Sequence, residues 1–285
     1  MAEFKISKFS SLSFYHNWKA SFQMNEQYIQ RFSTSDEIRI QYTVPSWGSF
    51  TVILVSHANN TTSSIPPVLV DTVNTERVIT YTYEVLLPVL EIGRYTLEIR
   101  SFGKLADRSC FCILPDEELE NTVLFTYTHR RNEYDAVFVD DNEEFTFFQW
   151  RVEGGFIPFE SSFLVDSEFF RDQRASITQL SAFPYKTQTL TLGAELGVPV
   201  WCAEKVNLIF SLSTILLDDT AYVRSEGATP QLTELLPFYP LYVYKIDLEE
   251  NENYSEILGI PKIKVLGTEK RNVLGTEDIK GLVIN

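Results

Sequence analysis

Strict alternation of apolar and polar residues is the feature that most restricts the fold of this chain. In the segment EIRIQYTV (residues 37–44), Ile38, Ile40 and Tyr42 fall on one parity, and most of the charged or polar residues fall on the other. This period of two is typical of a strand with one buried face, because successive side chains of a strand point to opposite faces of the sheet. The alternation therefore predicts β structure here.

Four more segments of the first third continue in the same way, and clusters of Gly, Pro, Asn and Ser separate them. They are SFTVILVSH, RVITYTYEVLL, LEIGRYTLEIRSFG and RSCFCIL, and the third places Tyr95, Leu97 and Ile99 on one face. Short alternating strands at this spacing are typical of a sandwich. We expect an immunoglobulin-like β-sandwich over residues 1–117, a fold that specifies no ligand.

A second, β-rich domain is expected over residues 118–250. The acidic, proline-containing segment 114–122 predicts a linker or a short helix at the boundary. Strands are expected at TVLFTYTH, at KTQTLTLG and at the closing FYPLYVYKIDLEE.

One or two helices are expected in this second domain. The stronger candidate lies near residues 198–213, where Trp201, Lys205 and Leu208 recur at helical spacing, as do Cys202, Val206 and Ile209. A shorter helix is predicted at residues 166–174.

Two hairpins are predicted over acidic turns, at residues 136–155 and at residues 214–227. A calcium loop at DDNEE is the alternative for the first turn, but the ligand spacing and the glycine of such a loop are absent.

The chain is acidic, with 39 Asp and Glu against 24 Lys and Arg and a formal net charge of -15. This charge disfavours direct binding to DNA or to anionic membranes. Two interpretations stay open: the charge keeps the protein in solution, or it lines a passage through which DNA slides without sticking.

The three cysteines are expected to pack in cores and to form no metal site. Cys110 and Cys112 share one face of a strand with Phe111 opposite, and Cys202 lies in an apolar stretch. With no disulfide framework, no secretory signal and no apolar run long enough to span a bilayer, a soluble protein folded in a reducing cytosol is expected.

No residue pattern indicates catalysis. His16, His57 and His129 stand in no catalytic signature, and no carboxylate pair is singled out among the many acids. We therefore expect no catalytic residue, no cofactor and no metal. The aromatic clusters EFTFFQWRVEGGF and PFYPLYVYK favour a core with a protein–protein interface over sugar stacking.

The word VLGTE occurs twice near the C-terminus, and Leu258, Leu266 and Leu274 recur at intervals of eight residues. An even interval returns each leucine to the same face of an extended chain, whereas a helix would rotate by about 80° over eight residues. Slippage in the gene is the alternative explanation for the identity of the two words. The spacing predicts an extended arm over residues 251–285. Its expected assembly contacts are Leu258, Val265, Leu266, Val273 and Leu274.

Six pieces of the second half resemble structural proteins of tail or neck modules in phages and prophages of gut Bacteroidetes, including crAss-like phages. In order, they are EGGF (153–156), FRDQR (170–174), PYKTQTLTLG (184–193), GVPVW (197–201), YVRSEGATP (222–230) and PLYVYKIDLE (240–249). This resemblance implies a non-enzymatic virion protein that forms a ring, an adaptor or a baseplate part with copies of itself. Neighbouring tail, neck or portal proteins would be further partners.

The resemblance further implies a virion location after assembly in the host cytoplasm, and no activity residues. A carbohydrate-binding adhesion sandwich is the alternative function, and a glycan-degrading enzyme is a third.

Overall fold

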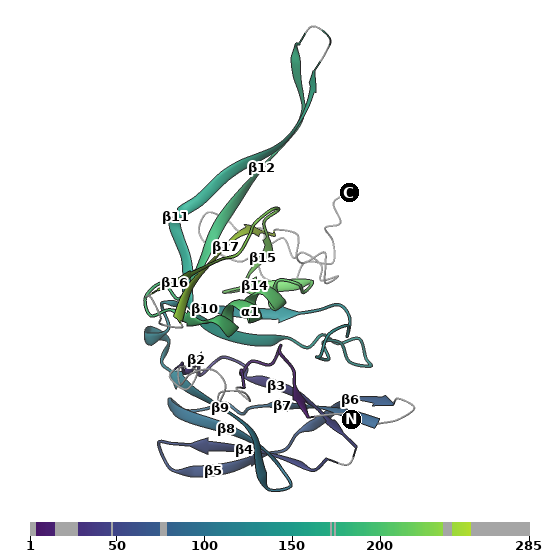
Figure 1. Ribbon diagram of the computed structural model, residues 1–285, viewed down its shortest axis with the longest axis vertical. Coiled ribbons are helices and arrows are strands. Elements are labelled where there is room, and N and C mark those ends of the chain that lie inside the picture. Colours follow the sequence, from purple (N-terminus) through teal and green to yellow (C-terminus); the bar gives the residue numbers. More distant parts are fainter. Residues whose placement is uncertain are drawn as a thin grey trace, which may run out of the picture. The chain divides into compact units, whose positions relative to one another are not determined.

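The computed structural model describes residues 4–14, 28–46, 48–74, 79–171, 173, 175–235 and 241–251 (Figure 1). These residues are mainly β, as predicted, and carry a single α-helix. They belong to one compact unit that extends to Asn251. The expected C-terminal arm and its contacts Leu258, Val265, Leu266, Val273 and Leu274 lie outside the described residues and stay a prediction.

The first part of the chain forms two sheets. One has the order β1 (Lys5–Ile6), β3 (Arg39–Pro45), β7 (Ile79–Leu86), β6 (Val68–Asn74). The other has the order β2 (Gln30–Ser33), β9 (Lys104–Leu114), β8 (Gly93–Ser101), β4 (Phe50–Ser56), β5 (Thr61–Ile65). Neighbouring strands are antiparallel, apart from the parallel pair β2 and β9.

The alternating residues of these strands form the core of the first part. Ile38, Ile40 and Tyr42 are buried, as are Tyr95, Leu97 and Ile99 of β8. This agrees with the faces predicted from the period of two, because only one face of each sheet meets the other sheet.

The burial of the cysteines was predicted only in part. Phe111 is fully buried in the core, so Cys110 and Cys112 on the other face of β9 are only half-buried. Core packing holds for Cys202 alone, which is fully buried.

In the second part, six antiparallel strands pair in a closed ring. The order is β10 (Thr122–Thr128), β11 (Phe148–Arg171), β12 (Ile177–Leu192), β17 (Leu241–Glu250), β15 (Thr220–Arg224), β14 (Thr214–Leu217), and β14 pairs with β10 again. Two short strands, β13 (Val198–Pro199) and β16 (Gln231–Glu234), also pair with β17. Because the six strands close on one another as a barrel does, none of them has an unpaired edge where the ring of strands is closed.

Alternate residues of the ring meet the apolar side of helix α1 (Val200–Ile209) in a second core. Phe125, Trp150 and Leu190 are fully buried there, together with Cys202 and Val206 of the helix. The helix predicted near residues 198–213 is confirmed with shorter bounds. It begins after Pro199, which is extended, and Phe210 follows its last residue.

The second helix, predicted at residues 166–174, is wrong. Strand β11 runs through this region to Arg171. The hairpin predicted at residues 136–155 is reduced to a single bridge between Val139 and Phe145, because β11 pairs with β10 instead. The hairpin at residues 214–227 is confirmed over a turn of Asp218 and Asp219, whose positive φ angles fit a tight hairpin turn.

Polar contacts join the sandwich to the second part. Arg151 of β11 forms two hydrogen bonds of 2.7 Å with the carboxylate of Asp36. The buried amide of Gln41 accepts a hydrogen bond from Val137 N and donates one to Val137 O. At the boundary, residues Asp116–Glu118 form a short 3-10 helix, in agreement with the predicted linker or short helix.

Candidate functional site

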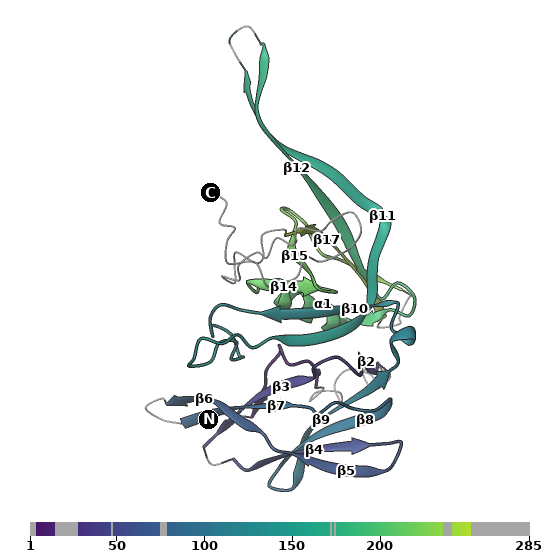
Figure 2. The ribbon, with the colours of Figure 1, turned by 180° about the vertical axis from the view of Figure 1, so that it is seen from behind.

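The most unusual surface is a long hairpin formed by β11 and β12, which leaves the closed ring and extends well beyond it (Figures 1 and 2). We call its distal part, residues 161–186, the arm. It is distinct from the C-terminal arm predicted over residues 251–285. The two strands pair with each other from Ser161 and Gln188 to Arg171 and Ile177, whereas the pairing of β12 with β17 ends at Thr187. Within the described residues, the strands of the arm therefore pair only with each other.

Glycine allows the two strands to come together at the base of the arm. Gly154 has a φ of +150°, and a Cβ atom there would lie 2.4 Å from the carbonyl oxygen of Thr191. The register then shifts between Phe156 and Ser161 and again between Glu168 and Phe169. Such irregularities bend a hairpin and change the direction of its side chains.

The arm exposes many large apolar side chains. Phe163 is 81% exposed, and seven others are each more than two-fifths exposed. The full set is Phe163, Leu164, Val165, Phe169, Phe170, Ile177, Leu180 and Phe183. Exposed apolar surface of this extent is a feature of protein–protein contacts, because burying it against a partner removes it from water.

The two faces of the arm differ in charge. Cross-strand partners share a face. Between Phe163 and the register shift after Glu168, Phe163 lies opposite Lys186 and Val165 opposite Pro184, so Lys186 is the charged residue of this face there. The other face carries Asp166 and Glu168, the two carboxylates among the described residues of the arm. This acidic face consists of Leu164, Asp166, Glu168, Phe183 and Tyr185.

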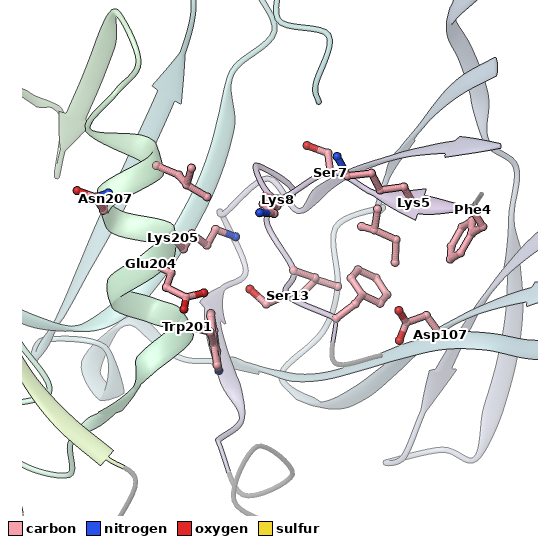
Figure 3. A pocket seen from close by; sticks show the side chains of 14 residues that line it. Phe4, Lys5, Ser7, Lys8, Ser13, Asp107, Trp201, Glu204, Lys205 and Asn207 are labelled. Carbon is pink, nitrogen blue, oxygen red and sulfur yellow. The ribbon is translucent and has the colours of Figure 1, made fainter. Parts of the chain in front are cut away.

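A second feature is a cavity of about 640 Å³ between the N-terminal segment and α1 (Figure 3). Its walls include the apolar side chains of Phe4, Leu12, Phe14, Trp201 and Leu208. Its charged lining consists of Lys5, Lys8, Lys205, Asp107 and Glu204. Of the three lysines, Lys5 pairs with Asp135 at 3.0 Å, Lys205 is buried, and Lys8 is exposed.

Lys205 is the buried cation of this cavity. Its side chain comes from α1 and donates a hydrogen bond to the carbonyl oxygen of Ser10, and its Nζ lies 5.1 Å from the ring centre of Trp150. The residue is only 5% exposed. Burial lowers the pKa of Lys205 to about 7, because removal of water disfavours the charged ammonium.

The low pKa of Lys205 predicts a pH-dependent stability. In unfolded chain a lysine has a pKa near 10.5, so between pH 7 and pH 10.5 the unfolded state binds a proton that the folded state lacks. Stability then rises with pH across this window. Relative to Lys205→Met, wild type should gain about 2 kcal/mol of unfolding free energy between pH 7 and pH 9. Urea titrations of both proteins measure it, and a constant difference would contradict a lowered pKa.

The two described histidines, His57 and His129, form hydrogen bonds with neighbouring residues. The Nδ1 atom of His129 accepts a hydrogen bond from Ser213 N at 3.0 Å, and burial lowers the pKa of His129. His57 Nε2 lies 2.8 Å from the hydroxyl of Thr96, and His16 lies outside the described residues. In the described part of the chain, no three His, Cys, Asp or Glu side chains are grouped to hold a metal ion. Nor is any helix of that part long and apolar enough to cross a membrane.

The aromatic clusters singled out in the sequence place some of their rings in the core. Phe148 and Trp150 of the first cluster and Tyr244 of the second are buried. The exposed phenylalanines are instead concentrated on the arm. The arm was not predicted, because part of it was predicted to be a helix at residues 166–174. The signal that indicates the arm is a run of apolar residues on both parities, as in Phe163, Leu164 and Val165, because a strand exposed on both faces shows no alternation.

Comparisons with protein-family models, with curated proteins and with solved structures gave no match to this chain. The arm and the cavity, together with the resemblance of the second half, are therefore the features that bear on function.

Proposed function

We propose that this chain is a non-enzymatic structural protein of a phage tail or neck, one subunit of a ring or adaptor that assembles through protein–protein contacts. The observation that carries the proposal is the exposed apolar arm. Two pieces of the resemblance, residues 170–174 and 184–193, fall at the distal end of the arm and on its returning strand.

The surface of the arm is large enough to contribute to a stable contact. A phenylalanine side chain buries roughly 150–250 Å². Phe163, Phe169, Phe170 and Phe183 are each more than half exposed, so they alone present on the order of 500 Å². A stable interface buries about 800 Å² on each partner. The four aliphatic residues of the arm supply much of the remainder.

The charge of the arm supports the same role. Residues 161–186 contain three acidic residues (Asp166, Glu168, Asp172) and three basic residues (Arg171, Arg174, Lys186), so their net charge is zero in a chain of -15. Like copies therefore do not repel each other through the net charge of their arms. Neighbouring tail, neck or portal proteins are the other proposed partners, in the virion after assembly in the host cytoplasm.

The alternative function, carbohydrate binding by the sandwich, receives less support. The aromatic rings of a sugar-binding platform must face solvent, whereas Phe32, Tyr42, Tyr95 and Phe111 of the sandwich are buried. These rings stabilise the core instead.

The test is the size of the purified protein. Light scattering coupled to gel filtration should show a particle of several copies at micromolar concentration, and negative-stain images should show closed rings. A monomer that never associates, alone or with neighbouring virion proteins, and that binds glycans on an array would overturn the proposal.

A further inference from the structure

We infer that the cavity between the N-terminal segment and α1 receives the acidic face of the arm of a second copy of this chain. The inference rests on the proposed function, and it names the two surfaces that meet in the assembly. Its support comes from the charge, the apolar lining and the size of the cavity, and from the reach of the arm.

Charge complementarity is the first argument. Lys8 is the cation of the cavity that can meet a carboxylate from outside. Lys5 already pairs with Asp135 at 3.0 Å, and the buried Lys205 donates its hydrogen bond to Ser10 O. Lys8 is exposed and forms no ion pair within the described residues. Asp166 and Glu168 of the arm are exposed, and neither forms an ion pair within the described residues. Opposite charges at a contact speed association and exclude wrong partners.

The apolar lining is the second argument. On the acidic face, the two carboxylates lie beside Leu164, Phe183 and Tyr185. The cavity likewise combines lysines with apolar walls, among them Trp201 and Leu208. Its volume of about 640 Å³ lies within the range that holds a drug-sized ligand, so more than one large side chain fits. Aromatic anchors in such pockets dominate the binding energy of protein interfaces.

The reach of the arm is the third argument. Eleven residues of β11, from Ser161 to Arg171, span roughly 35 Å at about 3.3 Å per residue. The arm and the cavity are different surfaces of the chain, so their contact is head-to-tail. Repeated head-to-tail contacts close into a ring when the rotation between copies allows it.

The test reverses charge on each surface separately and then on both. Lys8→Glu alone, and Asp166→Lys with Glu168→Lys, should each weaken association on the order of tenfold or more, measured as the concentration at which the assembly dissociates. The chain that carries all three substitutions should regain association, because the attraction is restored with opposite sign. The controls are Lys104→Glu, at the exposed start of β9, and Glu226→Lys, in an exposed turn; each reverses one charge outside both surfaces.

A carbodiimide cross-link supplies a second measurement on wild-type protein. A link from Lys8 to Asp166 or Glu168, formed between isotopically light and heavy copies, supports the inference. If wild type assembles but none of the substitutions alters its association, or if Lys8 links only to residues of its own copy, the cavity is not the receptor. If wild type does not assemble at all, the proposed function itself fails.

Discussion

A chain whose arm is replaced by a short turn is expected to be a folded monomer. The change joins Ser162 to Thr187 through Asn-Gly, since these two residues form a cross-strand pair and Asn-Gly favours a tight hairpin turn. It removes all eight exposed apolar residues of the arm but none of the buried residues of either core. Association should therefore be lost while the free energy of unfolding changes little. Light scattering measures the first quantity and urea unfolding the second.

A matched control for this deletion keeps the hairpin and its length. Replacing Val89 and Phe102 by Ser removes two exposed apolar residues of the sandwich and should leave the assembly intact. An armless chain that forms the same particle as wild type would contradict the role of the arm. An arm variant with Leu164→Asp and Phe183→Asp, two exposed apolar residues of the acidic face, provides a test in which the backbone is retained, and it should also be monomeric.

Asp36→Ala should produce the largest loss of stability. The Asp36 side chain is 1% exposed and that of Arg151 is 13% exposed, and the two groups share two hydrogen bonds of 2.7 Å. Asp36 also accepts a hydrogen bond from Ser33 N at 2.8 Å. Removing the carboxylate leaves a largely buried guanidinium without its ion-pair partner and, among the described residues, with only the hydrogen bond to Thr122 Oγ1, which costs about 3–5 kcal/mol of unfolding free energy. Urea unfolding measures this loss.

An exposed ion pair of the same chain provides the comparison. Arg131 and Glu133 are 3.3 Å apart, with side chains 79% and 52% exposed. Because solvent screens this pair, Glu133→Ala should cost less than about 1 kcal/mol. If Asp36→Ala cost no more than this control, the buried pair would not be what holds β11 to the sandwich.

The sequence predicted those parts of the fold in which one face of a strand is buried. Ile38, Ile40 and Tyr42, or Tyr95, Leu97 and Ile99, show the alternation because the core selects apolar residues on one parity only. Helix α1 was found for the corresponding reason, since Cys202, Val206 and Ile209 repeat at its own period.

The arm and the contact between the sandwich and the second part could not be predicted from local pattern. The arm is exposed on both faces, so no core imposes an alternation on it, and Phe169 and Phe170 follow Leu164 and Val165 at a spacing that imitates a helix. The contact of Asp36 with Arg151 joins residues 115 positions apart, and no spacing in the sequence indicates such a partner. Closure of the six-stranded ring likewise depends on pairings between distant segments, such as β12 with β17.

The neutrality of the arm also determines how the unassembled subunit behaves as a colloid. All of the formal net charge of -15 is carried outside residues 161–186. Electrostatic repulsion between dispersed copies therefore originates in the body, while the arm supplies only attraction. Near the isoelectric point of about 4.7 the body loses its net charge and the attraction is no longer opposed. Acidification should thus precipitate the intact chain through the surface that we propose as its assembly contact at neutral pH.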